Sequence, residues 1–223
     1  TWDSWAEDGC EWSLPISHEE YEKTTADNFT VYLTPCITVP HEWFGDLKGK
    51  KVFLFVGRLV ALKNVETIIR AFARLNQEEN IFAVVGDGPE RENLETLAKD
   101  LKANVIFTGR LEGDALNVWY NIADVIVLAS YQEAFGAVTN EALLAGCYAL
   151  ISNKAGSSCL VEEGENGYTF SPMDVDELTD KMKRLVELTN SVDKVVLKPN
   201  HMRVSYKEKM VDLVKYLKGI IAS

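Results

Sequence analysis

The sequence lacks any long uninterrupted hydrophobic run, although 47% of its 223 residues are hydrophobic. Charge or glycine breaks each apolar stretch within about ten positions, whereas a membrane-spanning helix needs about 20 consecutive apolar residues. The first dozen residues also lack the basic and then apolar pattern of a signal peptide, and the chain opens on Thr1 rather than Met. We therefore expect a cytoplasmic domain cut from a longer protein, with any membrane contact of the full-length protein being peripheral.

The sequence also lacks a stripe of lysine and arginine residues with aromatic residues between them. Its formal net charge is −11, from 34 acidic and 23 basic residues. A field of this sign repels polyanions, so nucleic acid is not an expected partner. Any bound phosphate must instead be held by a few local cations and by backbone N–H groups at helix starts.

Cysteines are few, and their spacing fits no metal site. The four are Cys10, Cys36, Cys147 and Cys159. Such scattered residues are interpreted as reduced thiols, which agrees with a cytoplasmic compartment. The sequence therefore predicts neither a disulfide framework nor a cysteine-bound metal.

What the sequence does contain is an alternation of short apolar runs with amphipathic stretches between residues 51 and 189. The expected strands are 51–56, 81–85, 105–108, 125–128 and 148–151, and the expected helices are 65–75, 90–101, 115–122, 137–145 and 175–188. Strands that alternate with helices form βαβ units. The predicted fold class is α/β, with a Rossmann-like parallel sheet covered by helices on both faces. Ligands of such sheets bind at the carboxyl ends of the strands.

Two basic residues follow the first of these strands. Gly57 and Arg58 come directly after it, and Lys63 precedes the next helix. Arginine presents a planar fork of donors and lysine a point charge, a combination that suits a diphosphate. The alternative is that both are solvated surface cations.

The loop after the second strand, Gly86-Asp87-Gly88-Pro89, imitates the start of a dinucleotide fingerprint. Arg91 stands where the third glycine belongs, and the following strand ends in Thr108 rather than in an acidic residue for a ribose. Binding of NAD is therefore disfavoured.

A glycine precedes the helix expected after strand 125–128. Gly136 frees the backbone there, so the N–H groups of Ala137, Val138 and Thr139 are expected to point at an anion, with the positive end of the helix dipole.

Two glutamates lie around this helix start. Glu133 precedes it and Glu141 lies within the helix. A carboxylate accepts hydrogen bonds from paired hydroxyls such as those of sugars and riboses. The alternative is one exposed helical glutamate and one loop glutamate without a shared ligand.

Together these loops resemble the donor-binding domain of retaining glycosyltransferases of the GT-B fold, glycosyltransferase family 4. The similarity covers residues 51–190 in consistent order. It is carried by Gly57-Arg58 with Lys63, Gly86-Asp87-Gly88-Pro89, Gly109, Glu133-x-Phe135-Gly136 with Glu141, and Gly164-x-x-Gly167. The resemblance implies transfer of a sugar from a nucleotide-diphospho-sugar with retention of the anomeric configuration. It also implies that cations and a helix dipole, in place of a metal or another cofactor, stabilise the leaving diphosphate.

The resemblance implies a role for each matching residue. Arg58 and Lys63 bind the donor diphosphate, and Glu133 binds the donor sugar; these three form the expected catalytic set. Glu141 binds the ribose, and Arg110 and Leu111 border the base. The complete expected donor-binding set is Gly57, Arg110, Leu111, Phe135, Gly136, Ala137, Val138, Thr139 and Glu141.

Three positions depart from the usual pattern of that family. Ala134 replaces a glycine after the first glutamate, Ala155-Gly156 stands where a pair of glycines is usual, and Cys159 stands where an acidic residue is frequent. These departures concern the sugar pocket and leave the expected phosphate site intact.

The resemblance divides the chain into three segments. Residues 1–49 are expected to be the remnant of a preceding domain and a hinge, residues 50–190 the nucleotide-sugar-binding domain, and residues 191–223 a C-terminal helical segment. The acceptor domain would then be a missing partner. An apolar patch left without it, along Leu213, Leu217 and Ile220 or around the amino-terminal tryptophans, would favour self-association. The alternatives are a Rossmann-like nucleotide-binding domain without transfer chemistry and a degenerate interaction domain. The transferase prediction requires Arg58, Lys63 and Glu141 to converge on one cleft.

Overall fold

The computed structural model describes residues 32–34, 37–38, 50–190 and 200–202. The centre of the described structure is one sheet of six parallel strands in the order β5-β4-β3-β6-β7-β8. The strands are β3 (Lys51–Val56), β4 (Asn80–Val85), β5 (Val105–Gly109), β6 (Val125–Leu128), β7 (Tyr148–Ser152) and β8 (Gly167–Phe170). The strand order reverses between β3 and β6, and ligands of open α/β sheets bind outside such a reversal point.

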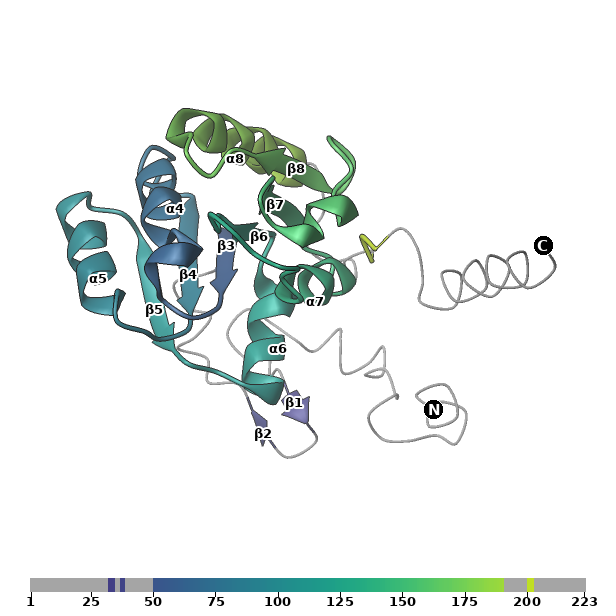
Figure 1. Cartoon of the computed structure of the whole chain (residues 1–223). Helices are drawn as coiled ribbons and strands as arrows, with labels where there is room; N and C mark the ends of the chain where they lie inside the picture. Colours follow the sequence, from purple (N-terminus) through teal and green to yellow (C-terminus); the bar gives the residue numbers. More distant parts are fainter. Residues whose placement is uncertain (1–31, 35–36, 39–49, 191–199, 203–223) are drawn as a thin grey trace, which may run out of the picture.

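Helices cover both faces of the sheet (Figure 1). On one face α4 (Val65–Phe72) packs against α5 (Arg91–Asp100) and α8 (Val175–Asn190). On the other face α6 (Gly113–Ile122) packs against α7 (Val138–Leu144). The predicted α/β, Rossmann-like fold class is confirmed.

The core forms where apolar runs cover the middle of the sheet. Phe53 of β3, Phe82 of β4 and Phe72 of α4 are fully buried. The ring of Phe72 lies 5.7 Å from that of Phe53 and 5.6 Å from that of Phe82, measured between centroids. Each such burial contributes about 1.5 to 3 kcal/mol, so these phenylalanines fix α4 against the centre of the sheet.

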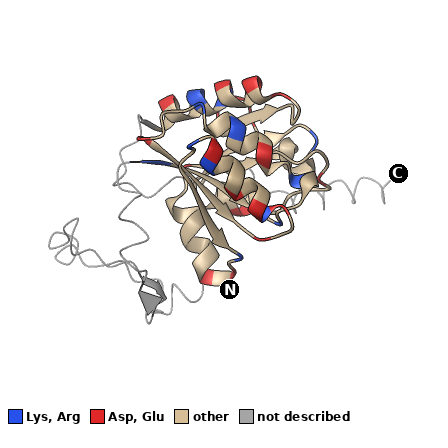
Figure 2. Ribbon diagram, turned by 90° about the vertical axis from the view of Figure 1, so that its left-hand side faces the viewer, with Lys and Arg blue, Asp and Glu red and all other residues tan. Residues whose placement is uncertain are grey.

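A buried lysine joins the first strand of the sheet to its last helix. Lys51 is 6% exposed, and its Nζ donates a hydrogen bond of 2.7 Å to the carbonyl oxygen of Thr189, near the C-terminus of α8. A cation suits the negative end of a helix dipole. Elsewhere, Lys and Arg residues alternate with Asp and Glu along the outer helices, as Figure 2 shows.

The structure differs from the sequence prediction mainly at short elements. Strand β8 was not predicted, because its four residues include two polar positions and begin with Gly167. The 3₁₀ helices η2 (Ala61–Lys63) and η3 (Gly156–Leu160) were also not predicted. The helix predicted over 65–75 ends at Phe72, and the chain then turns through a bond from the Leu75 N–H to the Phe72 carbonyl.

The flanking segments are described only in part. On the amino-terminal side, β1 (Tyr32–Thr34) pairs antiparallel with β2 (Ile37–Thr38). The apolar patch expected along Leu213, Leu217 and Ile220 or around the amino-terminal tryptophans lies outside the described residues. Nearly all of segments 1–49 and 191–223 also lie outside them, so the three-segment division stays a prediction. None of the described helices combines the length and the apolar character that crossing a bilayer requires.

Candidate functional site at the carboxyl edge of the sheet

The loops after β3 and β4 pack directly on each other at the carboxyl edge. The Leu59 N–H donates to the Asp87 carbonyl at 2.9 Å, and the Glu90 N–H donates to the Leu59 carbonyl at 3.1 Å. A Cβ added to Gly88 would lie 2.3 Å from the Leu59 carbonyl oxygen, which is closer than real Cβ atoms approach. The Gly86-Asp87-Gly88 sequence therefore serves the packing of these two loops.

The loops after β3 and β6 meet through an ion pair. The ammonium group of Lys63, at the end of η2, contacts the carboxylate of Glu133 in the loop before α7. Both side chains are mostly buried, with exposed fractions of 23% and 18%. A further bond of 3.0 Å runs from the Tyr131 N–H to the Leu62 carbonyl. Two residues of the expected catalytic set, 70 positions apart, thus lie together at the strand-order reversal.

The Glu133 loop is held on its other side by the loop after β7. The Glu133 N–H donates to the Lys154 carbonyl at 3.2 Å, and the Glu133 carbonyl accepts the Gly156 N–H at 3.0 Å. The Ser157 N–H donates to the Phe135 carbonyl at 2.7 Å. These three hydrogen bonds fix the backbone around Glu133.

Gly136 has the conformation that the sequence predicts, with a positive φ of 94°. A Cβ there would lie 2.8 Å from Leu128 Cδ2 and 3.0 Å from Ser157 Oγ. The positive φ and the lack of space for a Cβ both favour glycine at this position. The N–H groups of Ala137 and Val138 donate no hydrogen bond within the described residues.

The Thr139 amide departs from the expectation. It donates to the Gly136 carbonyl at 3.0 Å, because the chain closes a tight turn as it enters α7. The Thr139 hydroxyl lies 2.9 Å from that of Ser157, and both residues are fully buried. Thr139 therefore joins α7 to η3 in this structure rather than presenting a free N–H group at the edge.

Glu141 has a partner that the sequence did not reveal. The hydroxyl of Tyr120, a buried residue of α6, donates a 2.6 Å hydrogen bond to Glu141 Oε2. Burial, and then this bond, raise the pKa of Tyr120 well above its usual value of 10.0, so its hydroxyl stays a donor. The only sequence signal was an aromatic residue with a polar tip inside an amphipathic helix.

The remaining expected residues are placed as follows. Arg58, beside Gly57, is exposed, and its guanidinium has no ion-pair partner within the described part of the chain. Arg110 is exposed and pairs with Glu112, with Nε 2.9 Å from the carboxylate. Leu111 is partly buried against the core. Phe135 is 41% exposed.

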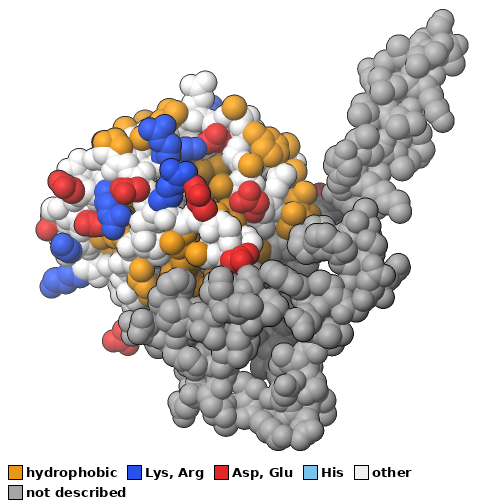
Figure 3. All heavy atoms as spheres, turned by 90° about the horizontal axis from the view of Figure 1, so that it is seen from below, with side chains coloured by type: hydrophobic (Ala, Val, Ile, Leu, Met, Phe, Trp, Pro, Cys, Tyr) orange, Lys and Arg blue, Asp and Glu red, His pale blue; other side chains and the backbone are white. Residues whose placement is uncertain are grey.

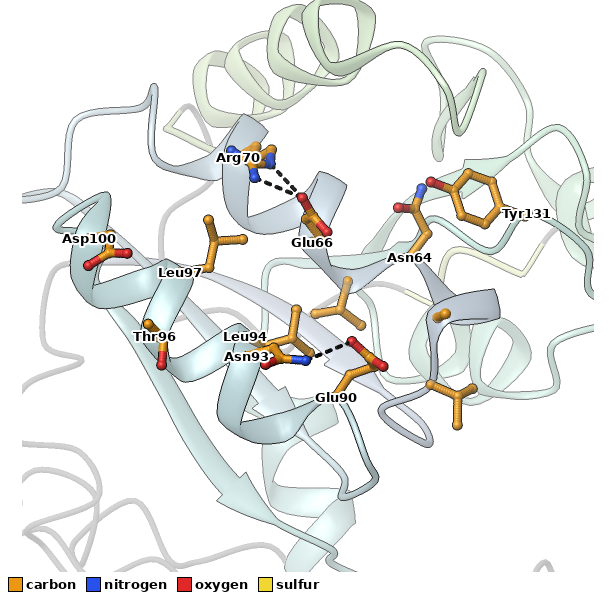
Figure 4. Close-up of a pocket in the computed structure, with 13 residues that line it drawn as sticks. Asn64, Glu66, Arg70, Glu90, Asn93, Leu94, Thr96, Leu97, Asp100 and Tyr131 are labelled. Carbon is orange, nitrogen blue, oxygen red and sulfur yellow. Dashed lines mark hydrogen bonds and ion pairs between the residues drawn. The ribbon is translucent and has the colours of Figure 1, made fainter.

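The edge itself is seen in Figure 3, which views the molecule from below and shows basic, acidic and hydrophobic side chains intermingled. A pocket of about 380 Å³ lies beside it, between η2, α4 and α5 (Figure 4). That pocket is lined by none of Arg58, Lys63 and Glu141. Their convergence on one cleft stays a prediction.

Metal-ligating side chains do not gather anywhere in the described ranges, where no group of three or more His, Cys, Asp and Glu residues could hold an ion. Cys147 is buried, and its thiol donates to the carbonyl oxygens of Tyr120 and Ala123 at 3.2 Å, whereas Cys159 is exposed. Cys10 and Cys36 lie outside the described residues.

Residues 42–200 match the family of glycosyl transferases group 1. An uncharacterised glycosyltransferase of Methanocaldococcus jannaschii is 34% identical over 140 residues, which are 61% of this chain and 36% of that protein. The sulfoquinovosyl transferase of Arabidopsis thaliana is 32% identical over 140 residues, 61% of this chain and 27% of that protein. The chain thus spans about a third of the length of these relatives.

Solved structures of other proteins have a fold similar to that of this chain. HepE from Anabaena in complex with UDP matches with a TM-score of 0.65 and 22% identity, over 81% of this chain and 51% of HepE. The C-terminal domain of a group 1 glycosyl transferase, LpcC of Francisella tularensis, matches with a TM-score of 0.62 and 22% identity, over 77% of this chain and 91% of that domain. The chain therefore belongs to the glycosyl transferases of group 1 and has the Rossmann-like fold of their GT-B domains.

Proposed function

We propose that this chain is the donor-binding, C-terminal half of a retaining glycosyltransferase, and that its donor is a nucleotide-diphospho-sugar. The observation that carries the proposal is the contact between Lys63 and Glu133 at the strand-order reversal. It joins the loop with the expected diphosphate cations to the loop with the expected sugar carboxylate. The match to the glycosyl transferases of group 1 supports the same donor-binding role. The positions of these two loops support it as well.

The proposed chemistry breaks the bond between the anomeric carbon of the sugar and the diphosphate oxygen. Negative charge develops on the leaving diphosphate, and Arg58 and Lys63 stabilise that charge from fixed positions. An acceptor hydroxyl forms the new bond on the same face of the sugar, and its proton passes to the oxygen of the departing diphosphate. No metal or other cofactor takes part in this proposal, because the two cations and the Ala137 and Val138 amides meet the diphosphate.

Lys63 is suited to serve both groups at once. An ammonium group has three donors, so it can keep its contact with Glu133 while donating to a phosphate oxygen. The carboxylate holds the ammonium in place, which reduces the side-chain entropy lost on binding. Glu133 and Glu141 then accept hydrogen bonds from hydroxyls of the sugar and the ribose, respectively.

Relatives support the donor class and the C-terminal position. HepE has been solved with UDP and with UDP-glucose, and the LpcC fragment is described as a C-terminal domain. We further propose that the acceptor domain precedes this chain, and that the full enzyme is cytoplasmic or peripheral to the membrane. The nucleotide sugar and this acceptor domain are then the partners, with no role for nucleic acid.

A thermal-shift panel of nucleoside diphosphates and their sugar conjugates tests the donor class. A ligand that binds only the folded state stabilises it by RT ln(1 + [L]/Kd), so we expect a concentration-dependent shift with one base. A shift with dinucleotides alone would overturn the proposal. Equal shifts for a nucleoside diphosphate and all its conjugates would favour a nucleotide-binding domain without transfer chemistry. The anomeric configuration of the product of the full-length enzyme, read by NMR, tests retention.

A further inference from the structure

Asn64 occupies the junction between η2 and α4, directly after Lys63. Its backbone is left-handed, with φ 53° and ψ 41°, a conformation that asparagine tolerates better than most residues. The residue is buried, with 5% of its surface exposed. Figure 4 shows the Asn64 side chain next to Tyr131, at the end of the pocket formed with α4 and α5.

The Asn64 amide connects three segments that are far apart in the sequence. Its Nδ2 donates to the carbonyl of Ala129, which follows β6, at 3.2 Å. The same nitrogen donates to the carbonyl of Pro172, between β8 and α8, at 2.9 Å. Its Oδ1 accepts the hydroxyl of Thr67 at 2.8 Å, which fixes the orientation of the amide. Both hydrogens and the oxygen are thus used inside the protein.

These bonds fix the start of the Glu133 loop relative to Lys63. Ala129 lies four positions before Glu133, and Asn64 directly follows Lys63. The amide therefore bridges the two segments that carry the ion pair. The bond from the Tyr131 N–H to the Leu62 carbonyl lies between the same two segments. Removal of the amide would leave two buried carbonyls without a donor and would free η2 to shift.

We infer that Asn64 is a positioning residue, which holds Lys63 at the place where it meets the diphosphate of the donor. The inference rests on the proposed function. It assigns Asn64 no contact with the donor itself, so its effect must pass through Lys63. A residue that merely stabilises the fold would instead affect binding whether or not Lys63 is present.

A double-mutant cycle separates these two roles. Asn64→Gly keeps the left-handed backbone accessible and deletes the amide. The probe is inorganic pyrophosphate, and its affinity is measured by calorimetry for wild type, Asn64→Gly, Lys63→Ala and the double variant. We expect Asn64→Gly to weaken binding about tenfold in the wild-type background and not at all in the Lys63→Ala background. Asn93→Ala, an exposed asparagine of the same pocket, is the matched control with unchanged affinity.

Any other pattern of affinity losses would overturn the role of Asn64, the proposed function or both. Equal losses in both backgrounds would overturn the role of Asn64, while the loss from Lys63→Ala alone would leave the proposed function standing. A wild-type chain that binds neither pyrophosphate nor any nucleoside diphosphate would overturn both. If Asn64→Gly does not fold, Thr67→Ala takes its place, because it removes the hydrogen bond that orients the amide. Thr67→Ala must then weaken pyrophosphate binding only when Lys63 is present.

Discussion

Each of the two glutamates at the carboxyl edge is held by a side chain from another element. Lys63 of η2 contacts Glu133, and Tyr120 of α6 donates to Glu141. A held carboxylate loses less conformational freedom when a ligand arrives, so both contacts favour binding of a polyol ligand. The sequence predicted the two glutamates because of their place around Gly136. It could not predict Tyr120, since that contact depends on how α6 packs against α7.

The Tyr120 hydroxyl is expected to act on ribose binding alone. Tyr120→Phe removes one hydrogen bond and little volume, so we expect the affinity for a nucleoside diphosphate to fall by about 0.5 to 1.5 kcal/mol. Glu141→Gln should weaken the same ligand, and neither variant should weaken inorganic pyrophosphate. Calorimetry with both ligands measures the difference. Tyr168→Phe, on β8, is the control, and equal losses for the two ligands would refute the ribose assignment.

At the scale of elements, the sequence predicted the strands and helices whose hydrophobic pattern can be recognised within one continuous stretch of residues. Strand β3 was predicted with its observed bounds because Lys51 is followed by the continuous apolar run Val52–Val56. Elements η2 and β8 were not predicted because neither has an uninterrupted apolar run, whereas β6, with four residues, was predicted from the apolar run Val125–Leu128. The packing of Gly88 on Leu59 was not predicted, for a different reason. It is a contact between loops distant in sequence, and a glycine motif alone does not reveal what it approaches.

The start of α8 gives a prediction for stability against pH. The Asp174 carboxylate accepts the Glu177 N–H at 2.9 Å, while Glu177 accepts the Ser171 N–H at 2.9 Å and pairs with Lys181 at 2.7 Å. The hydrogen bond from Lys181, and then that from Ser171, hold the pKa of Glu177 below its ordinary value of 4.5. A lowered folded-state pKa contributes stability above about pH 4.5, and this is lost as the pH falls through the folded-state pKa.

Glu177→Gln should therefore destabilise the chain by about 0.5 to 1 kcal/mol at pH 7, since Glu177 is partly exposed and its ion pair is screened. The difference from wild type should shrink at pH 3. Urea unfolding at both pH values measures it. Glu187→Gln, on the same helix, is the control. A deficit that stayed constant across this range would contradict the ionic explanation.

At the scale of the whole molecule, the chain matches one part of longer glycosyltransferases. Its family match covers residues 42–200, and it spans 36% of its relative from Methanocaldococcus jannaschii. Transfer requires donor and acceptor to be held within reacting distance, and this positioning supplies several kcal/mol of catalysis. A domain with a donor site alone lacks that contribution.

We therefore predict donor binding without detectable transfer by this chain. The assay offers the donor with a panel of acceptor hydroxyl compounds and measures release of the nucleoside diphosphate. Addition of the amino-terminal domain of the full-length protein should restore turnover. Robust transfer by the chain alone would refute the picture of a separate acceptor domain.

The proposed separation from an acceptor domain also predicts self-association. Leu62, Tyr131 and Phe135 are 50%, 43% and 41% exposed, and they belong to the loops of the carboxyl edge. Apolar side chains gathered at an open edge favour contact between copies. Light scattering over a range of concentrations should show a rising apparent mass. Tyr131→Ser with Leu62→Ser should reduce it, and a constant monomer mass for wild type would contradict the prediction.

The central claim is that a diphosphate binds at the loop after β3, which carries Arg58 and Lys63. Isothermal titration with the nucleotide sugar selected by the thermal-shift panel tests it most directly. We expect Arg58→Ala and Lys63→Ala each to weaken binding by about 1 to 3 kcal/mol, the range for charge-assisted hydrogen bonds, with an unchanged fold. Arg184→Ala, on the exposed side of α8, should bind as wild type does. Wild-type affinity in both Arg58→Ala and Lys63→Ala would contradict the account.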